Sequence, residues 1–274
     1  MSTKPAYLCI DMHIFPLYAS SLTNSDAKSA HYVTGPETMT DISQAFVTAL
    51  HLLVAFDANL VEIVGLSLRV SLSAVALAVL VGLPLGAWLA LFKFPGRDAI
   101  IVFLNALMGL PPVVVGLVVY LMLSRSGPLG VLGLLFTPTA MIVAQAILVT
   151  PIVAALTRQV VADLWVEYSE QMRSMGASPL GAIPALLYDA RFTLVTAVLA
   201  GFGRASAEVG AVMIVGGNID SVTRVMTTAI ALETNRGNLA TALGLGIVLL
   251  ALALAVNGAA HLISTSARRR AAQA

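Results

Sequence analysis

Three charged side chains stand within otherwise apolar stretches of this sequence, and they are the first candidates for chemistry. Arg204 and Glu208 are four residues apart, so on a helix they lie on one face and pair with each other. Arg69 lies in an earlier apolar stretch. A charge at the centre of a bilayer is unfavourable, so each group should face protein or water. The pair either locks helices together or makes Arg204 a cationic element of an anion pathway. Arg69 either joins that pathway or extends towards the membrane surface.

The sequence lacks the motifs of an enzyme. It contains no Gly-x-x-x-x-Gly-Lys-Ser/Thr phosphate-binding loop, and none of its three lysines follows a glycine. It also lacks His-Glu-x-x-His and Gly-x-Ser-x-Gly, and its four histidines are scattered. Cys9 is the single cysteine, which excludes an internal disulfide and a cysteine-built metal site. We therefore expect no catalytic residues, no metal site and no cofactor bound by this chain.

The composition is typical of an integral membrane protein. Of the 274 residues, 58% are hydrophobic and 11% are charged, against about 25% charged in an average soluble domain. The net charge of +1 gives no reason to expect a nucleic-acid partner. Five apolar stretches are long enough to cross a bilayer core about 30 Å thick. We therefore predict an all-α integral membrane protein with five transmembrane helices, at 61–92, 99–123, 134–156, 192–215 and 239–264.

Glycines and prolines modify these spans. The spacing Gly82-x-x-x-Gly86 would permit another helix to approach closely. Pro111 and Pro112 should kink or unwind the second span near its middle. Transporters tend to place their pathways at discontinuous helices, so these two prolines are candidates for a translocation pathway. A kink that serves only packing is the alternative.

The segment 165–190 lies between two spans but is patterned like a soluble element. Gly176-Ala177 interrupts a helical pattern, and Ser178-Pro179 has the form of a helix start. We predict a helix, a tight turn and a second helix, which is too long for an ordinary connection. The segment either docks a partner outside the bilayer or lies on the membrane surface as an amphipathic connector. The second helix would carry an apolar stripe of Leu180, Ile183, Leu186 and Leu187.

Basic residues predict the orientation in the cell (inner) membrane. If the connection 93–97, the loop 157–191 and the C-terminus lie inside, the inner side carries eight basic residues and the outer loops carry three. The positive-inside rule favours this arrangement, with the N-terminus outside and the C-terminus in the cytoplasm. The inner set is Lys93, Arg97, Arg158, Arg173, Arg191, Arg268, Arg269 and Arg270, and the outer set is Arg125, Arg224 and Arg236.

The first 56 residues are unlike the rest. Residues 1–38 are polar and without periodicity, which predicts a disordered or mis-annotated extension, with translation starting at Met39. From Asp41 to Phe56 apolar residues fall on one helical face, but about 16 residues are too few to span the membrane. We predict an interfacial helix here, with a buried helix as the alternative. The predicted domain is then 39–264, followed by a basic cytoplasmic tail, 265–274.

The predicted helix–turn–helix carries a resemblance to a known family. Glu170-Gln171-Met172, followed by Gly176, is similar to the "EAA" loop of ABC-importer permeases, in which Glu-Ala-Ala is followed by three residues and a glycine. Both alanines are replaced here, and Tyr188-Asp189 stands where the family usually has Leu-Pro. Other blocks resemble the permeases of tungstate-type oxyanion importers. They are 108–116, 134–140, 203–213, 216–219 and 223–234, and the resemblance covers about residues 40–260.

The resemblance implies a type I importer in which two copies of this permease domain, 39–264, form a homodimeric pore. Two cytoplasmic ATPase subunits, which use ATP and Mg²⁺, would dock on the coupling loop, 165–190. An extracytoplasmic binding protein would deliver the anion, and membrane lipid would surround the pore. The residues that the resemblance assigns to coupling are Glu170, Gln171, Met172, Gly176 and Ala177, and the pathway candidates are Arg69, Pro111, Pro112, Arg204 and Glu208.

The substrate implied by the resemblance is a tetrahedral oxyanion, tungstate first and molybdate next. Tungstate, molybdate and sulfate differ little in shape and charge, and the family places their discrimination in the separate binding protein. A stand-alone, ion-coupled secondary transporter of an anion is the alternative. It would account for kinked helices and buried charges, but not for a long structured loop between two spans.

Overall fold

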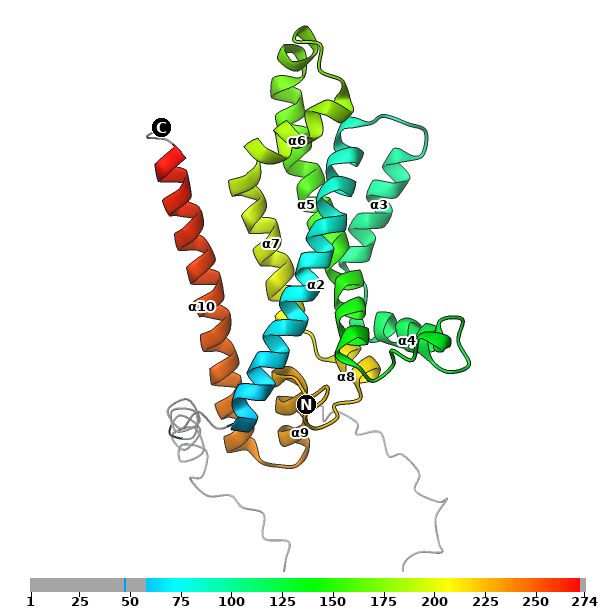
Figure 1. Ribbon diagram of the computed structural model, residues 1–274, viewed down its shortest axis with the longest axis vertical. Helices are drawn as coiled ribbons and strands as arrows, with labels where there is room; N and C mark the ends of the chain where they lie inside the picture. Colours follow the sequence, from blue (N-terminus) through cyan, green and yellow to red (C-terminus); the bar gives the residue numbers. More distant parts are fainter. Residues whose placement is uncertain (1–46, 48–57, 272–274) are drawn as a thin grey trace, which may run out of the picture. The chain divides into compact units, whose positions relative to one another are not determined.

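The computed structural model describes residue 47 and residues 58–271, which belong to one compact unit, Met39–Ala274. In this part of the chain all regular structure is helical, as predicted (Figure 1). The expectations for 1–38 and for the interfacial helix at 41–56 lie outside the described residues, apart from Val47, which is helical and exposed. The elements are α2 (Ala58–Leu91), α3 (Arg97–Met108), α4 (Pro112–Leu123), the 3₁₀ turn η2 (Gly130–Leu132), α5 (Pro138–Ser174), α6 (Pro179–Asp189), α7 (Arg191–Ser206), α8 (Gly210–Gly216), α9 (Met226–Asn235) and α10 (Leu239–Ala271).

The two longest helices, α2 and α5, pack along each other. They have 34 and 37 residues, so they extend about 51 and 55 Å, well beyond a hydrocarbon core of about 30 Å. A Cβ atom at Gly86 would lie 2.4 Å from the carbonyl oxygen of Ala154, so the two backbones are in contact there. The predicted close approach at Gly82-x-x-x-Gly86 is confirmed, because Gly82 also faces Val153 and Ala154.

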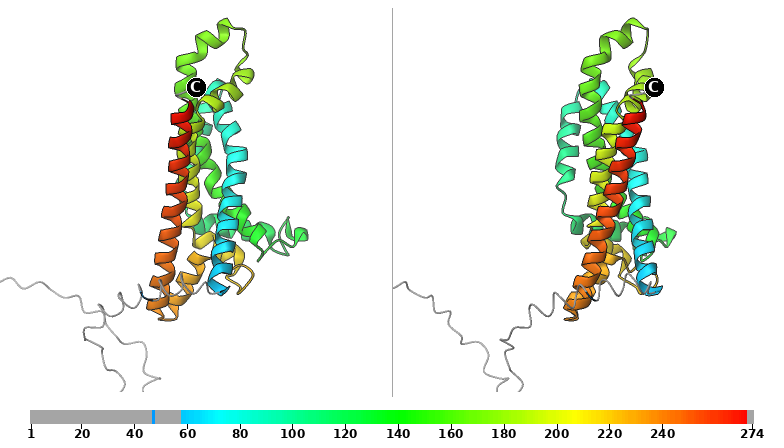
Figure 2. Two further views of the ribbon diagram at one scale, coloured as in Figure 1. Left: turned by 60° about the vertical axis from the view of Figure 1, so that its left-hand side comes forward. Right: turned by 90° about the vertical axis from the view of Figure 1, so that its left-hand side faces the viewer.

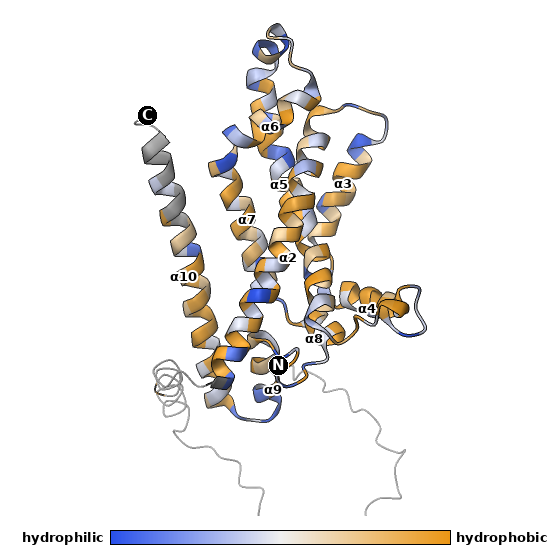
Figure 3. Cartoon of the chain, viewed as in Figure 1, coloured by the Kyte–Doolittle hydropathy of each residue, from blue (hydrophilic) through white to orange (hydrophobic). Residues whose placement is uncertain are grey.

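Three helices, α2, α5 and α10, are long and apolar enough to cross a membrane alone. Two bent pairs could each add one span: α3 with α4, bent by 101°, and α6 with α7, bent by 77°. The described part of the chain therefore has three to five candidate spans. The expected number of five holds if each bent pair counts as one span. The helices α3, α7 and α10 are apolar along much of their length, as Figure 3 shows.

The second predicted span, 99–123, is not one straight helix. The kink expected at Pro111-Pro112 is confirmed, but it is much larger than a kink within a span, since α4 lies across the bundle rather than along it (Figure 1). Pro111 is extended and Pro112 opens α4, because a proline cannot continue the hydrogen bonding of the preceding helix. The side of α4 with Val115 and Val119 packs against Val212 and Val215 of α8.

The fourth predicted span, 192–215, is also divided. Helix α7 ends at Ser206, residues 207–209 are not helical, and α8 begins at Gly210. The helix that contains the fifth predicted span is longer than that span, since α10 extends to Ala271 and includes residues 265–271 of the predicted tail. The α2–α3 connection, α6 and the C-terminal end of α10 lie at one end of the bundle, and α4, α8 and α9 lie at the other (Figures 1 and 2). The segments predicted to face the cytoplasm therefore share one end.

Candidate translocation and docking sites

The break between α7 and α8 is organised around Glu208. Arg204 Nη1 donates to Glu208 Oε2 at 3.0 Å, and the Glu208 side chain is 4% exposed whereas that of Arg204 is 31% exposed. The second carboxylate oxygen, Oε1, accepts from the backbone N–H of Ala211 at 3.0 Å. A carboxylate at the first turn of α8 satisfies a free N–H there and interacts favourably with the helix dipole. The predicted pairing of Arg204 with Glu208 is confirmed, and Glu208 in addition caps a helix.

The backbone groups freed by this break also have partners. Gln145 of α5, which is 3% exposed, donates through Nε2 to the carbonyl oxygen of Ala205 at 3.1 Å. Thr227 of α9 donates through Oγ1 to the carbonyl oxygen of Glu208 at 2.9 Å. A non-helical backbone at membrane depth needs such partners, because lipid supplies none. Sequence reasoning missed Gln145 and Thr227. The signal for Gln145 was an amide within the apolar stretch 134–156.

The two helix breaks lie side by side. A Cβ at Gly116 of α4 would lie 2.7 Å from Cα of Ala211 in α8, and a Cβ at Gly210 would lie 2.8 Å from Cγ2 of Val113. Pro111 and Pro112, at the start of α4, are therefore next to the Glu208 cap at the start of α8. Two adjoining broken helices are an arrangement that transporters use at their pathways.

Arg69 is not part of this cluster. It lies on the exposed side of α2, in line with Gly65 and Leu72. It forms no ion pair with any residue that the structure describes. The structure thus brings together Arg204, Glu208, Pro111 and Pro112, and it leaves Arg69 apart from them.

The segment between α8 and α9 is held by the hydroxyl group of Thr223, which is fully buried. Its Oγ1 donates to the carbonyl oxygen of Gly216 at 2.6 Å and accepts from the N–H of Ile219 at 2.9 Å. Further along, the N–H of Met226 donates to Ser67 Oγ of α2 at 2.8 Å. These bonds fix the start of α9 against α2.

The helix–turn–helix predicted at 165–190 is present, and we call it the α5–α6 hairpin. Helix α5 ends at Ser174, Gly176 has a left-handed φ of 77°, and Ser178 Oγ accepts from the N–H of Gly181 at 3.1 Å. Among the predicted coupling residues Glu170, Gln171 and Gly176 are exposed, while Met172 and Ala177 are half-buried.

The apolar stripe of α6 is narrower than predicted. Leu186 is fully buried with Ala182, and both pack against Ala87, Leu91 and Val161, whereas Ile183 and Leu187 are half-buried. Leu180 was assigned to the stripe wrongly, since it is 64% exposed. It lies in the first turn of α6, two residues after the Ser178 cap, where the helix has not yet reached α2 and α5.

The hairpin also presents a shallow depression, between the last turns of α5 and helix α6. Its lining combines apolar and polar side chains from Tyr168, Gln171, Met172, Met175, Leu186 and Asp189. Within the described residues, no cluster of three or more His, Cys, Asp or Glu side chains could hold a metal ion.

Comparison with known proteins decides the class of this chain. Residues 82–269 match the family described as "Binding-protein-dependent transport system inner membrane component". The chain belongs to this family. It is an ABC permease, as its resemblance to ABC-importer permeases indicated, and family membership decides against the stand-alone carrier.

The permease matches individual relatives over most of the relatives' length. It is 43% identical over 216 residues to the "Tungstate uptake system permease protein TupB" of Peptoclostridium acidaminophilum, covering 79% of this chain and 95% of that protein. It is 39% identical over 220 residues to the protein of the same name from Campylobacter jejuni, covering 80% and 92%. It is 44% identical over 203 residues to the "Probable anion ABC transporter permease protein" of Haloferax volcanii, covering 72% and 88%.

As a member of this family, the permease is a multi-pass membrane protein and a non-catalytic transmembrane subunit that binds no cofactor itself. ABC permeases work with an ATPase and a binding protein. The expectation that this chain is not an enzyme is confirmed by that membership.

Proposed function

We propose that the permease imports a tetrahedral oxyanion, with tungstate as the preferred substrate and molybdate next, delivered by an extracytoplasmic binding protein. The observation that supports this substrate assignment is the similarity to two tungstate uptake permeases over 95% and 92% of their lengths. Membership of the family supports the proposed mode of transport, in which a separate ATPase drives import.

The α5–α6 hairpin is the proposed docking site for the ATPase. It extends past the membrane-spanning part of α5 and exposes Val166, Met175 and Tyr188 by 82%, 73% and 69%. Apolar side chains that lie outside the lipid favour a protein partner, and Glu170 and Gln171 add exposed polar groups beside them. Coupling through Glu170, Gln171, Met172, Gly176 and Ala177 would transmit movement of the ATPase into α5 and α6.

The proposed pathway lies along the adjoining helix breaks of two copies of the permease, which together form the pore. The exposed part of the Arg204 side chain keeps donors available beyond its bond to Glu208. Arg69, on the exposed side of α2, would supply a second cation for an anion. Pro111 and Pro112 would set the α3–α4 break that faces the pathway.

The proposed orientation places the hairpin and the C-terminus in the cytoplasm. It is supported by the excess of basic residues, eight against three, in the segments that share the end of the bundle with the hairpin. The opposite end, with α4, α8 and α9, would then face the binding protein.

Uptake of radioactive tungstate by cells tests the substrate. Cells that lack the permease gene should lose high-affinity tungstate uptake and regain it with the wild-type gene, and excess molybdate should compete more strongly than excess sulfate. Uptake should survive an ionophore that collapses ion gradients and stop when the ATPase partner is removed. Tungstate uptake that is unchanged in the deletion strain would show that the permease carries another solute.

A further inference from the structure

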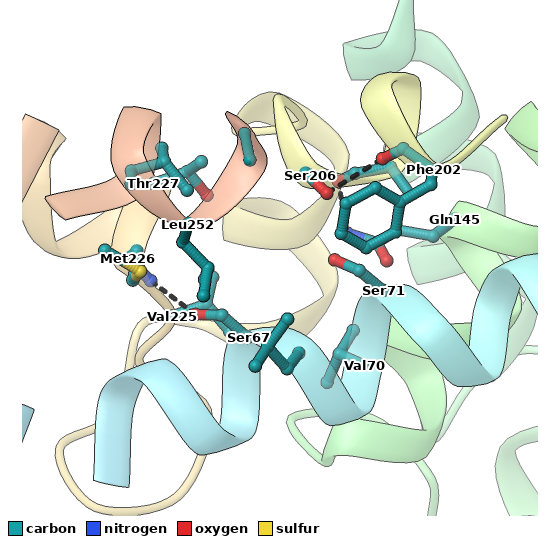
Figure 4. Close-up of a pocket in the computed structure, with 14 residues that line it drawn as sticks. Ser67, Val70, Ser71, Gln145, Phe202, Ser206, Val225, Met226, Thr227 and Leu252 are labelled. Carbon is teal, nitrogen blue, oxygen red and sulfur yellow. Dashed lines mark hydrogen bonds between the residues drawn. The ribbon is translucent and has the colours of Figure 1, made fainter. Parts of the chain in front are cut away.

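A small cavity lies inside the permease protomer, where α2, α5, α7, α9 and α10 meet (Figure 4). Its volume is about 20 Å³, and its lining is mainly apolar. A water molecule needs about 10–15 Å³ of such space and two to four polar partners. The polar members of the lining are Ser67, Ser71, Gln145, Ser206 and Thr227.

Gln145 points to a ligand in this cavity. Its Nε2 is used by the carbonyl of Ala205, but its Oε1 is buried and accepts no hydrogen bond from any described residue. The side chain is 3% exposed, so bulk solvent does not reach it. A buried carbonyl oxygen without a donor is strongly unfavourable, and the great majority of such groups in proteins have partners.

Ser71 supplies the complementary group. Its side chain is 5% exposed, and its hydroxyl takes part in no hydrogen bond with the residues that the structure describes. Ser71 and Gln145 both line the cavity, as Figure 4 shows. One water molecule between them would donate to Gln145 Oε1 and bond to Ser71 Oγ, with a further acceptor in Ser206 Oγ, whose proton goes to the carbonyl of Phe202.

We propose that this cavity binds one water molecule that bridges Gln145 and Ser71. The water completes the hydrogen bonding of the side chain that caps α7 at its break, and it connects α5 to α2 at the same point. A monovalent cation is the other small ligand that neutral oxygens can hold, but it would need more oxygen ligands than the unpaired groups here supply.

A double-mutant cycle tests this water in the full-length permease in lipid nanodiscs. Ser71→Val fills the cavity and removes the hydroxyl, so it should leave Gln145 Oε1 without a partner and lower the midpoint of thermal unfolding by about 2–6 °C. In a Gln145→Met background there is no orphaned oxygen, and Ser71→Val should lower the midpoint by less than half as much. Ser73→Val, on the same helix and outside the cavity, is the matched control and should shift both backgrounds equally.

Equal shifts from Ser71→Val in the two backgrounds would overturn the proposal. So would a wild-type midpoint that rises in sodium chloride but not in choline chloride and loses this dependence in Gln145→Met, since a cation would then occupy the cavity. A cryo-electron microscopy map that shows ordered waters gives a test without variants. Density within hydrogen-bond distance of Gln145 Oε1 is expected, and an empty cavity in such a map contradicts it.

Discussion

Arg204 Nη1 lies 3.0 Å from Glu208 Oε2, and this ion pair spans the point at which α7 ends. The carboxylate also caps α8, so Glu208 holds both sides of the break. The arginine has only the ion pair among these bonds, and about a third of its side chain is exposed. Glu208 therefore contributes more hydrogen bonds to the structure than Arg204 does. Variants of the two residues can test whether the pair has a structural role or a role in transport.

Arg204→Ala should destabilise the permease by about 1–3 kcal/mol, because it leaves a buried carboxylate without its counter-charge. Arg204→Ala combined with Glu208→Gln should recover most of this loss, since the amide keeps an oxygen for the Ala211 N–H and carries no charge. Thermal unfolding and tungstate uptake are measured on the same preparations. A double variant that is stable but inactive assigns the Arg204–Glu208 pair to the pathway. A double variant that is stable and active limits the pair to a structural role.

Gly176→Asp should abolish uptake without loss of membrane insertion. It places a side chain at a left-handed φ of 77° and a charge on the proposed docking surface. Gly96→Asp is the matched control, because Gly96 has a φ of 91°, also has open space around it and lies in the α2–α3 connection at the same end of the bundle. Loss of uptake in both variants would point to strain or charge at this end, and normal uptake in Gly176→Asp would remove the docking assignment.

Gly86→Ala should destabilise the permease by about 1–3 kcal/mol, because the new Cβ meets the Ala154 carbonyl oxygen at 2.4 Å and must separate α2 from α5. Gly65→Ala on the same helix has nothing within 4 Å and should be neutral or slightly stabilising, as alanine favours a helix more than glycine does. The midpoint of thermal unfolding in nanodiscs compares the two. Similar midpoints would show that the helices separate at Gly86 without loss.

Thr223→Val should cost about 2–3 kcal/mol, since one buried hydroxyl donates to the carbonyl of Gly216 and accepts from the N–H of Ile219. Thr234→Val removes an exposed bond to the carbonyl of Ile230 and should change stability by less than about 0.5 kcal/mol. Limited proteolysis of the segment between α8 and α9 should detect the loss of Thr223. Equal protection in the two variants would argue against this role.

Glu233, in the last turn of α9, should make this end of the permease sensitive to acid. Its pKa is lowered by a hydrogen bond from Asn238, and then by a hydrogen bond and charge from Arg236, against an opposing effect of burial. A carboxyl whose folded pKa is depressed stabilises the protein above its unfolded pKa, and this contribution is lost as the pH falls through the folded value. The unfolding midpoint of Glu233→Gln should therefore depend less on pH in the acid range than that of wild type. An unchanged pH dependence would contradict the prediction.

Much of this architecture could be predicted from the sequence because apolar length and helix caps are local properties. The helices α2, α5 and α10 follow from uninterrupted apolar runs, and the α5–α6 hairpin follows from Gly176 and the Ser178-Pro179 start. The pairing of Arg204 with Glu208 follows from their spacing.

The remainder depends on contacts between distant segments. The 101° turn of α4 needs α8 to pack against, and an apolar run by itself does not show where it bends. The end of α7 at Ser206 depends on Gln145, 60 residues away along the chain, and on Thr227. The exposure of Leu180 depends on where α6 first meets α2 and α5.

The unbroken course of α5 has a mechanical consequence. Gln145, which caps α7, and Glu170, in the hairpin, belong to one helix and are about 37 Å apart along its axis. A helix transmits an axial push or pull almost without compression, so a displacement of the hairpin must reach the cap of α7 as a translation or be taken up as bending. Pro151 lies between the two residues and lacks the N–H that would bond to the preceding turn. The helix α5 should therefore bend most easily at Pro151. If the hairpin moves when the proposed ATPase docks, the stiffness of α5 around Pro151 would set how much of that movement reaches the broken helices.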